Sequence, residues 1–352
     1  MHTLRAVVVS CLLALSGAGC HYFPTSMKEG TTPSERCREA ADAGSPAETI
    51  VAECSVVVDT DAGRPRTVAS ALVNRGNAYL SMGIPDRAIA DYDEAILRIP
   101  DYEIAFVDRG NAHLAKGDAA GALHDFDEAV RLKPGFVVAL FGRARARLAM
   151  NDADGAIEDC DKAVHIDERF AAGFVCLGGA YAIKDDFDRA IEHYDRALAL
   201  APKSTAALVN RGSAYGSKRE AERAEMDFAA AIRIDSRNAA AFGARCWLRA
   251  TVRGSLDDAL ADCSEALRLR PGDPGWFANR GLVQFRLGSY KQAVADCSSA
   301  IDKEPRNARA LYVRGAARKR FGAIELGDAD LALATKIDPT IADAMARYDV
   351  RP

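Results

Sequence analysis

The stretch VNRGNAYLSMGIPDRAIADYDEAILRIP, residues 73–100, contains two short phrases that return along the chain. The first is the Arg-Gly step at Arg75, and the second is AIADY, whose Asp91 follows Arg75 by 16 residues. The phrases return as DRGNAHL with ALHDF, as NRGSAYG with AEMDF, and as NRGLVQF with AVADC. Internal similarity at a fixed period predicts a repeat architecture.

Aligned on these phrases, residues 69–341 divide into seven units of 34 residues and one of 35. If the Gly of the Arg-Gly step is position 8, small residues recur at positions 8, 20 and 27, and an aromatic residue or Cys usually occupies position 24. Small residues allow two helices to approach closely, and a Pro at position 32 of six units ends the second helix. The units are 69–102, 103–136, 137–170, 171–204, 205–238, 239–273, 274–307 and 308–341.

This pattern resembles the tetratricopeptide repeat family, in which each unit of 34 residues folds into two antiparallel helices. The resemblance implies an all-α fold, an α-solenoid of stacked antiparallel helix hairpins that form a right-handed superhelix. Stacking is required because one hairpin cannot bury its apolar face alone. One departure from the family is position 7, which is often Leu there and is usually Arg here.

Shorter segments flank the eight units. The sixth unit contains Arg-Cys at 245–246 and Asp-Cys at 262–263. The same pattern, with the same spacing, occurs before the first unit as Arg-Cys at 36–37 and Glu-Cys at 53–54. We therefore expect residues 34–68 to form a degenerate N-terminal capping hairpin and loop. Residues 342–352 are expected to form a short C-terminal capping helix and tail, because a solenoid needs caps at its ends.

The N-terminus has the features of an export signal. Residues 1–19 combine a positive start, a short apolar run and small residues, which is typical of a secretory signal peptide. The end of this segment resembles bacterial lipoprotein signals and implies lipidation of Cys20, although Gly17 stands where Leu is usual, so ordinary cleavage after Ala18 remains open. Residues 20–33 are expected to form a flexible tether. Both readings place the protein in the cell envelope or periplasm, where disulfides persist.

Position 7 is Arg and position 23 is Asp in the same seven units. In an antiparallel hairpin these two positions lie at similar heights, which predicts an ion pair inside each hairpin. The fourth unit has Leu177 and His193 instead, and this joint loss favours pairing within the unit rather than between units. The expected pairs are Arg75–Asp91, Arg109–Asp125, Arg143–Asp159, Arg211–Asp227, Arg245–Asp262, Arg280–Asp296 and Arg314–Asp330.

Positions 8 and 24 also face each other, so cysteines there could form disulfides. Each Cys could equally be a small buried hydrophobic residue. The spacing of Cys and His does not fit a zinc site, and we expect no metal and no cofactor. The possible pairs are Cys37–Cys54 and Cys246–Cys263 within hairpins and Cys160–Cys176 between neighbouring units, which leaves Cys297 over.

The repeats occupy nearly the whole mature chain, and no common catalytic motif occurs, so we expect no enzyme. A net charge of −4 argues against a nucleic-acid partner. In a solenoid of this type the first helices line the inner wall, which binds ligands. In some family members Asn at position 6 holds a peptide backbone; the alternative is that these residues only solvate the helix. The candidate binding residues are Asn74, Asp108, Asn210 and Asn279 at position 6, with Asn77, Asn111 and Arg145 at position 9.

Together these features predict a non-enzymatic protein–protein interaction scaffold of the bacterial cell envelope. It resembles envelope lipoproteins with tetratricopeptide repeats, attached to a membrane through Cys20, and would bind an extended peptide or a partner helix of an envelope protein. The alternative is a periplasmic module that binds glycan or peptidoglycan fragments by stacking sugars on aromatic rings. The rings expected on the inner wall are Phe141, Trp247, Phe285 and Tyr312.

Overall fold

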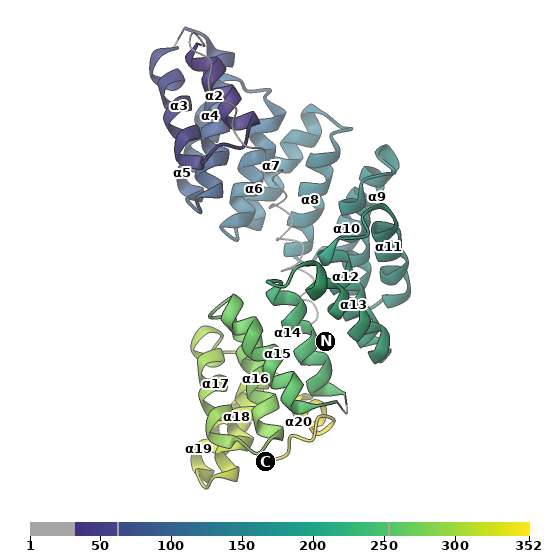
Figure 1. The fold of residues 1–352 in the computed structure, drawn as a ribbon. Coiled ribbons are helices and arrows are strands. Elements are labelled where there is room, and N and C mark those ends of the chain that lie inside the picture. Colours follow the sequence, from purple (N-terminus) through teal and green to yellow (C-terminus); the bar gives the residue numbers. More distant parts are fainter. Residues whose placement is uncertain (1–31, 62, 253) are drawn as a thin grey trace. The chain divides into compact units, whose positions relative to one another are not determined.

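The structure is a computed structural model that describes residues 32–61, 63–252 and 254–352. Within these ranges the secondary structure consists of α-helices without any strand, so the predicted all-α fold is confirmed. The predicted signal peptide, Cys20 and nearly all of the tether lie outside the described residues. The described chain divides into two compact bodies, residues 32–186 (the N-terminal body) and residues 187–352 (the C-terminal body) (Figure 1).

Each predicted unit contributes a first and a second helix, and the division between the bodies falls between the two helices of the fourth unit. The N-terminal body contains α2 (Pro33–Asp42), α3 (Ala47–Thr60), α4 (Pro65–Ser81), α5 (Pro85–Arg98), α6 (Glu103–Ala115), α7 (Ala119–Leu132), α8 (Val137–Ala149), α9 (Ala153–Ile166) and α10 (Ala171–Ile183). The C-terminal body contains α11 (Phe187–Leu200), α12 (Thr205–Ser217), α13 (Ala221–Ile234), α14 (Ala239–Thr251), α15 (Leu256–Leu269), α16 (Pro274–Arg286), α17 (Tyr290–Lys303), α18 (Ala308–Arg320), α19 (Ile324–Ile337) and α20 (Ile341–Ala346).

The turn inside each hairpin depends on position 15 of the unit. This residue has a positive φ in seven units, for example +73° at Gly83 and +80° at Gly117. Glycine adopts this conformation without steric cost, and it ends the first helix so that the chain can reverse. The second helix then starts at a residue that suits an N-terminus, such as Pro85 or the capping Asp118, whose side chain accepts from the N–H of Gly121.

Small residues set the distance between the two helices of a hairpin. In the fifth unit, a Cβ on Gly212 would lie 2.7 Å from the ring of Phe228. The Phe228 side chain is 2% exposed, and Ala224 and Ala231 on the same helix are fully buried. The ring therefore fills the space that the absent side chain leaves, which is the close packing that positions 8, 20, 24 and 27 predicted.

First helices also contact the first helices of neighbouring hairpins. In the N-terminal body this holds for α2, α4, α6, α8 and α10 in sequence, and in the C-terminal body for α12, α14, α16 and α18. We call the surface that these first helices present, on the side away from the second helices, the inner wall. Residues at positions 6 and 9 of each unit belong to these helices, so the wall is where the candidate binding residues are found.

All seven expected Arg–Asp pairs form within their hairpins. Arg211 is representative: it donates from Nε to Oδ2 of Asp227 at 2.8 Å and from Nη2 to Oδ1 at 2.7 Å. The seven Asp side chains are buried, none more than 7% exposed. A buried carboxylate requires a partner of opposite charge, because desolvation would otherwise disfavour it strongly.

The same Arg residues also connect neighbouring hairpins, which the sequence argument did not foresee. Arg109 donates from Nη1 to Asp93 of the preceding hairpin at 2.6 Å. Equivalent contacts join Arg75 to Ser55, Arg143 to Asp127, Arg211 to Asp195, and Arg314 to Ser298. In the fourth unit Leu177 replaces this Arg, and Asp161, the counterpart of Asp93 and Asp127, is exposed.

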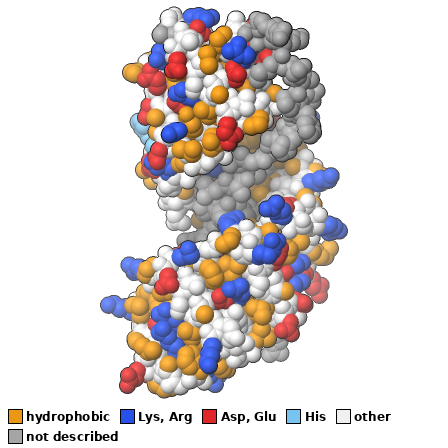
Figure 2. Space-filling view, turned by 60° about the vertical axis from the view of Figure 1, so that its left-hand side comes forward, with side chains coloured by type: hydrophobic (Ala, Val, Ile, Leu, Met, Phe, Trp, Pro, Cys, Tyr) orange, Lys and Arg blue, Asp and Glu red, His pale blue; other side chains and the backbone are white. Residues whose placement is uncertain are grey.

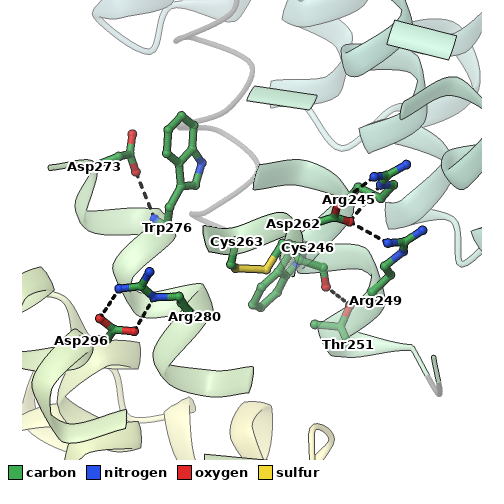
Figure 3. Close-up of a disulfide and its surroundings, with 11 residues drawn as sticks. Arg245, Cys246, Arg249, Thr251, Asp262, Cys263, Asp273, Trp276, Arg280 and Asp296 are labelled. Carbon is green, nitrogen blue, oxygen red and sulfur yellow. Dashed lines mark hydrogen bonds and ion pairs between the residues drawn. A yellow bond between two sulfur atoms is a disulfide. The ribbon is translucent and has the colours of Figure 1, made fainter. Parts of the chain in front are cut away.

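Three disulfides lie in the described residues, Cys37–Cys54 and Cys246–Cys263 within hairpins and Cys160–Cys176 between α9 and α10. Figure 3 shows Cys246–Cys263 beside the Arg245–Asp262 pair. Arg249, one turn further along α14, also donates to Asp262, from Nη1 to Oδ2 at 2.8 Å. Cys297 is buried and not in a disulfide. Its sulfur faces Gly281. In the two hairpins with an internal disulfide, the position equivalent to Gly281 is the second Cys.

Replacement of Arg211 by Ala should lower the free energy of unfolding by about 2–4 kcal/mol, because it leaves the buried carboxylate of Asp227 unpaired. The exposed Arg237 is the matched control, and its replacement by Ala should change stability by less than about 0.5 kcal/mol. Urea unfolding followed by circular dichroism measures both values. Equal losses in the two variants would contradict a structural role for the pair.

Candidate functional site

Five of the seven polar residues predicted for the inner wall form a row in the N-terminal body. Asn74 and Asn77 belong to α4, Asp108 and Asn111 to α6, and Arg145 to α8. Asn77 is exposed, and the other four are half-buried. The row therefore crosses three consecutive hairpins on the side of the first helices.

Hydrogen bonds connect α4 to α6 within this row. Asn77 donates from Nδ2 to Asp108 at 3.2 Å, and its Oδ1 accepts from the hydroxyl of Tyr92 at 2.6 Å. Burial raises the pKa of Tyr92, so its hydroxyl stays protonated and remains a donor. The tyrosine thus fixes the orientation of the Asn77 amide, with its nitrogen toward Asp108.

A second contact connects α6 to α8. Arg145 donates from Nη1 to Oδ1 of Asn111 at 3.2 Å, and its guanidinium lies 5.8 Å from the ring centroid of Phe141. Its Nε is buried and has no hydrogen-bond partner among the residues that the structure describes. Burial lowers the pKa of Arg145, although an arginine stays charged at neutral pH. This cation is available to an acceptor that approaches the wall.

At its N-terminal end the row borders a cavity of about 240 Å³ between α2, α3 and α4. Ser34, Arg38, Ser70 and Asn74 line it together with apolar side chains. Asn74 also points its amide nitrogen toward Sγ of Cys37 at 3.9 Å. The capping hairpin α2–α3 therefore extends the polar row by one hairpin.

The two candidate residues in the C-terminal body are placed differently. We expected Asn210 and Asn279 to be accessible on the wall, but the structure buries both, at 1% and 8% exposed. For Asn279 the reason is visible, because α16 lies between α14 and α18 and contacts both. The seven predicted residues therefore do not form one ladder, and the accessible row is confined to residues 74–145.

The aromatic rings predicted for the wall are not free to stack on a ligand. Phe285 and Tyr312 are buried, at 5% and 6% exposed. Phe141 packs edge-on against Phe170 with ring centroids 5.3 Å apart, and Trp247 packs against Tyr348 at 5.5 Å.

In the described part of the chain no group of His, Cys, Asp and Glu has the arrangement of a metal site, and no helix is long and apolar enough to cross a bilayer. The face seen in Figure 2 mixes acidic, basic and hydrophobic side chains over both bodies.

Comparisons with known proteins identify the repeats. Sequence profiles of the tetratricopeptide repeat match residues 69–102, 107–169, 171–204 and 205–238. The chain belongs to the tetratricopeptide repeat family. Tetratricopeptide repeat proteins bind other proteins or peptides and are typically non-enzymatic, so the repeats support a role as a protein–protein interaction scaffold.

Solved structures with tetratricopeptide repeats have a similar fold. A chain of the APC/C hetero-tetramer Cut9–Hcn1 matches with a TM-score of 0.62 and 16% identity, over 80% of this chain. The match covers only 55% of the length of that chain. Yeast Tom70 matches with a TM-score of 0.59 and 14% identity over 96% of this chain and 72% of that chain. A tetratricopeptide repeat protein from Parabacteroides merdae matches with a TM-score of 0.55 and 16% identity, over 76% of this chain and 98% of that chain. At these identities the likeness concerns the fold alone, and no curated protein matches the sequence.

Asp108 should make the stability of the repeats depend on pH. Burial raises its pKa to about 6, above the value of about 3.9 in an unfolded chain. The folded state therefore binds more protons between these values, and the free energy of unfolding falls as the pH rises through this range. Asp108→Asn should stabilise the protein by roughly 1–2 kcal/mol at pH 7.5 and by less than half as much at pH 4.5.

Urea unfolding at the two pH values measures this effect. The exposed Asp101 is the matched control, and Asp101→Asn should change stability by less than about 0.5 kcal/mol at either pH. If Asp108→Asn had the same effect at pH 4.5 as at pH 7.5, the carboxyl would not have a raised pKa.

Proposed function

We propose that this tetratricopeptide repeat protein is a non-enzymatic adaptor of the bacterial cell envelope. Its ligand is an extended peptide segment of another envelope protein, which binds along the inner wall of the N-terminal body. The observation that carries this proposal is the polar row from Asn74 to Arg145, which crosses three consecutive hairpins and is accessible at Asn77, Asn111 and Arg145.

The chemistry of the row suits a peptide backbone. An amide side chain both donates and accepts, as a peptide group does, so it can bind a backbone of any sequence. Asn77 and Asn111 occupy the same position of successive units, and each uses its oxygen for a contact within the protein. The amide nitrogen of Asn111 can donate to a peptide carbonyl, and the half-buried guanidinium of Arg145 beside it supplies a positive charge.

Two features support export. The N-terminal sequence is typical of a signal peptide that ends at a lipidated Cys20, and three disulfides occur in the described residues. Disulfides persist in the periplasm and rarely in the cytosol. The glycan-binding alternative has less support, because its four predicted rings are buried or packed against other aromatic side chains.

The binding site can be tested by affinity capture from an envelope extract. A variant with Asn77, Asn111 and Arg145 all changed to Ala should lose partners that the wild type retains. The control changes the exposed residues His124, Glu158 and Lys162 on second helices to Ala and should retain them. Circular dichroism confirms that both variants fold. Identical partners for all three proteins would refute the assignment of the site.

The membrane anchor can be tested by fractionation of cells that express the wild type or Cys20→Ser. The wild type should be in the membrane fraction, and Cys20→Ser should be in the soluble fraction, because one lipid-modified residue carries the attachment. A wild-type protein in the soluble fraction, with an intact mass that shows no lipid, would contradict the anchor and leave the binding site unaffected.

A further inference from the structure

The C-terminal segment of the chain lies on the inner wall of the last three hairpins. The helix α20 contacts α18, and the chain then turns at Asp349, whose φ is +61° (Figure 1). Val350 has no exposed surface, and Ile341 and Met345 are 4% and 3% exposed. These three side chains belong to the same hydrophobic cluster as the cores of the last hairpins.

The contacts of the last residues extend beyond the last hairpin. Tyr348 packs edge-on against Trp247 of α14, with ring centroids 5.5 Å apart. Asp349 lies 3.6 Å from Nη2 of Arg286, the last residue of α16. The carbonyl of Arg351 accepts from Arg320 of α18 at 3.3 Å. A terminal cap needs to cover only the last hairpin, whereas a segment that crosses three first helices is arranged as a ligand of the wall.

A buried cation lies next to this segment. Arg309 of α18 is 8% exposed, and its guanidinium lies 4.5 Å from the ring centroid of Trp247. Its Nε and Nη1 have no hydrogen-bond partner among the described residues. The carboxylate of Asp349 is directed to Arg286 instead. A ligand that brought a carboxylate to Arg309 would therefore make a contact that the chain's own segment does not make.

The segment also has features of a displaceable ligand. The Asp349 side chain is 80% exposed, so its ion pair with Arg286 contributes little. Its positive φ is unfavourable for a residue with a Cβ. What holds the segment is mainly the burial of Val350 and the contact between Tyr348 and Trp247, together with its covalent attachment.

We propose that the inner wall of α14, α16 and α18 is a second binding site, specific for a peptide segment with an aromatic residue next to a carboxylate, and that residues 347–352 occupy it as an internal competitor. The proposal rests on the proposed role of the inner wall, but it concerns other hairpins. A segment attached by a short linker has an effective concentration on the order of millimolar. A partner must therefore bind more tightly than this segment, and the contact with Arg309 supplies the means.

The test uses the full chain and a fluorescein-labelled peptide of residues 341–352, IADAMARYDVRP, followed by fluorescence anisotropy. Val350→Asp places a charge at a position with no exposed surface and should release the segment. We expect this variant to bind the peptide at least about ten-fold more tightly than the wild type does. Arg351→Asp, the same change at the exposed neighbouring residue, should bind the peptide as weakly as the wild type.

Specificity is tested in the Val350→Asp background. A peptide with its Tyr replaced by Ala should bind about ten-fold more weakly, because it loses the ring contact with Trp247. The added change Arg309→Ala should leave the affinity for the unchanged peptide as it is, because the carboxylate of Asp349 is directed to Arg286. If Val350→Asp lowered the helix content, a chain that ends after Arg347 and keeps α20 replaces it, with the same expectation.

Three results would overturn the proposal. One is equal binding by the wild type and by both released forms of the chain. Another is binding that does not depend on the tyrosine of the peptide, or that is lost with Arg309→Ala, which would mean that the segment itself already uses this cation. The third is a wild-type dimer in sedimentation that becomes a monomer when residues 348–352 are removed, because the segment would then occupy a second copy. None of these results depends on Asn77, Asn111 or Arg145, so failure here and failure of the proposed function are distinguishable.

Discussion

A buried Arg–Asp ion pair joins the two helices in seven of the eight repeat units, and the rest of the structure depends on it. The Arg donates two hydrogen bonds to the Asp of the second helix and, where the preceding hairpin has Asp or Ser at position 25, generally a further one to that hairpin. The same side chain thus fixes the angle within a hairpin and the stacking between hairpins. Because the carboxylate is buried, either partner alone would be costly, which explains why the fourth unit lacks both.

This arrangement has a consequence for binding. The contacts that hold the layers together involve positions 7, 8, 23 and 24, so residues at positions 6 and 9 of the first helices can differ from hairpin to hairpin without loss of the fold. In the N-terminal body these positions form an accessible polar row, from Asn77 to Arg145. In the C-terminal body the comparable positions include the buried Asn279 and Trp247, which contacts the chain's own end. Repeats of one pattern therefore provide two surfaces of different chemistry.

Titratable groups of the inner wall differ from those of the ion pairs. Burial raises the pKa of Asp108 to about 6 and lowers the pKa of Arg309 to about 10, because neither has a direct partner of opposite charge. In an ion pair the effect is the opposite, and hydrogen bonds to Asp227 raise the pKa of Arg211. A charge that is buried without such a partner adds no stability to the fold, which is the reason that the proposed binding sites are placed at these groups.

The repeated pattern alone was enough to predict the helix hairpins, the seven ion pairs and the three possible disulfides. It did so because a repeat presents each position eight times, and features such as Arg75 with Asp91 appear or disappear together. The contacts between hairpins, such as Arg109 with Asp93, depend on how neighbouring units stack, which the pattern within one unit does not give. Only the tertiary structure decided that Asn210 and Asn279 are buried and that the C-terminal segment crosses three hairpins. Burial on the wall depends on which neighbouring side chains cover a position, and Tyr348 and Asp349 reach α14 and α16 at a turn that no periodicity encodes.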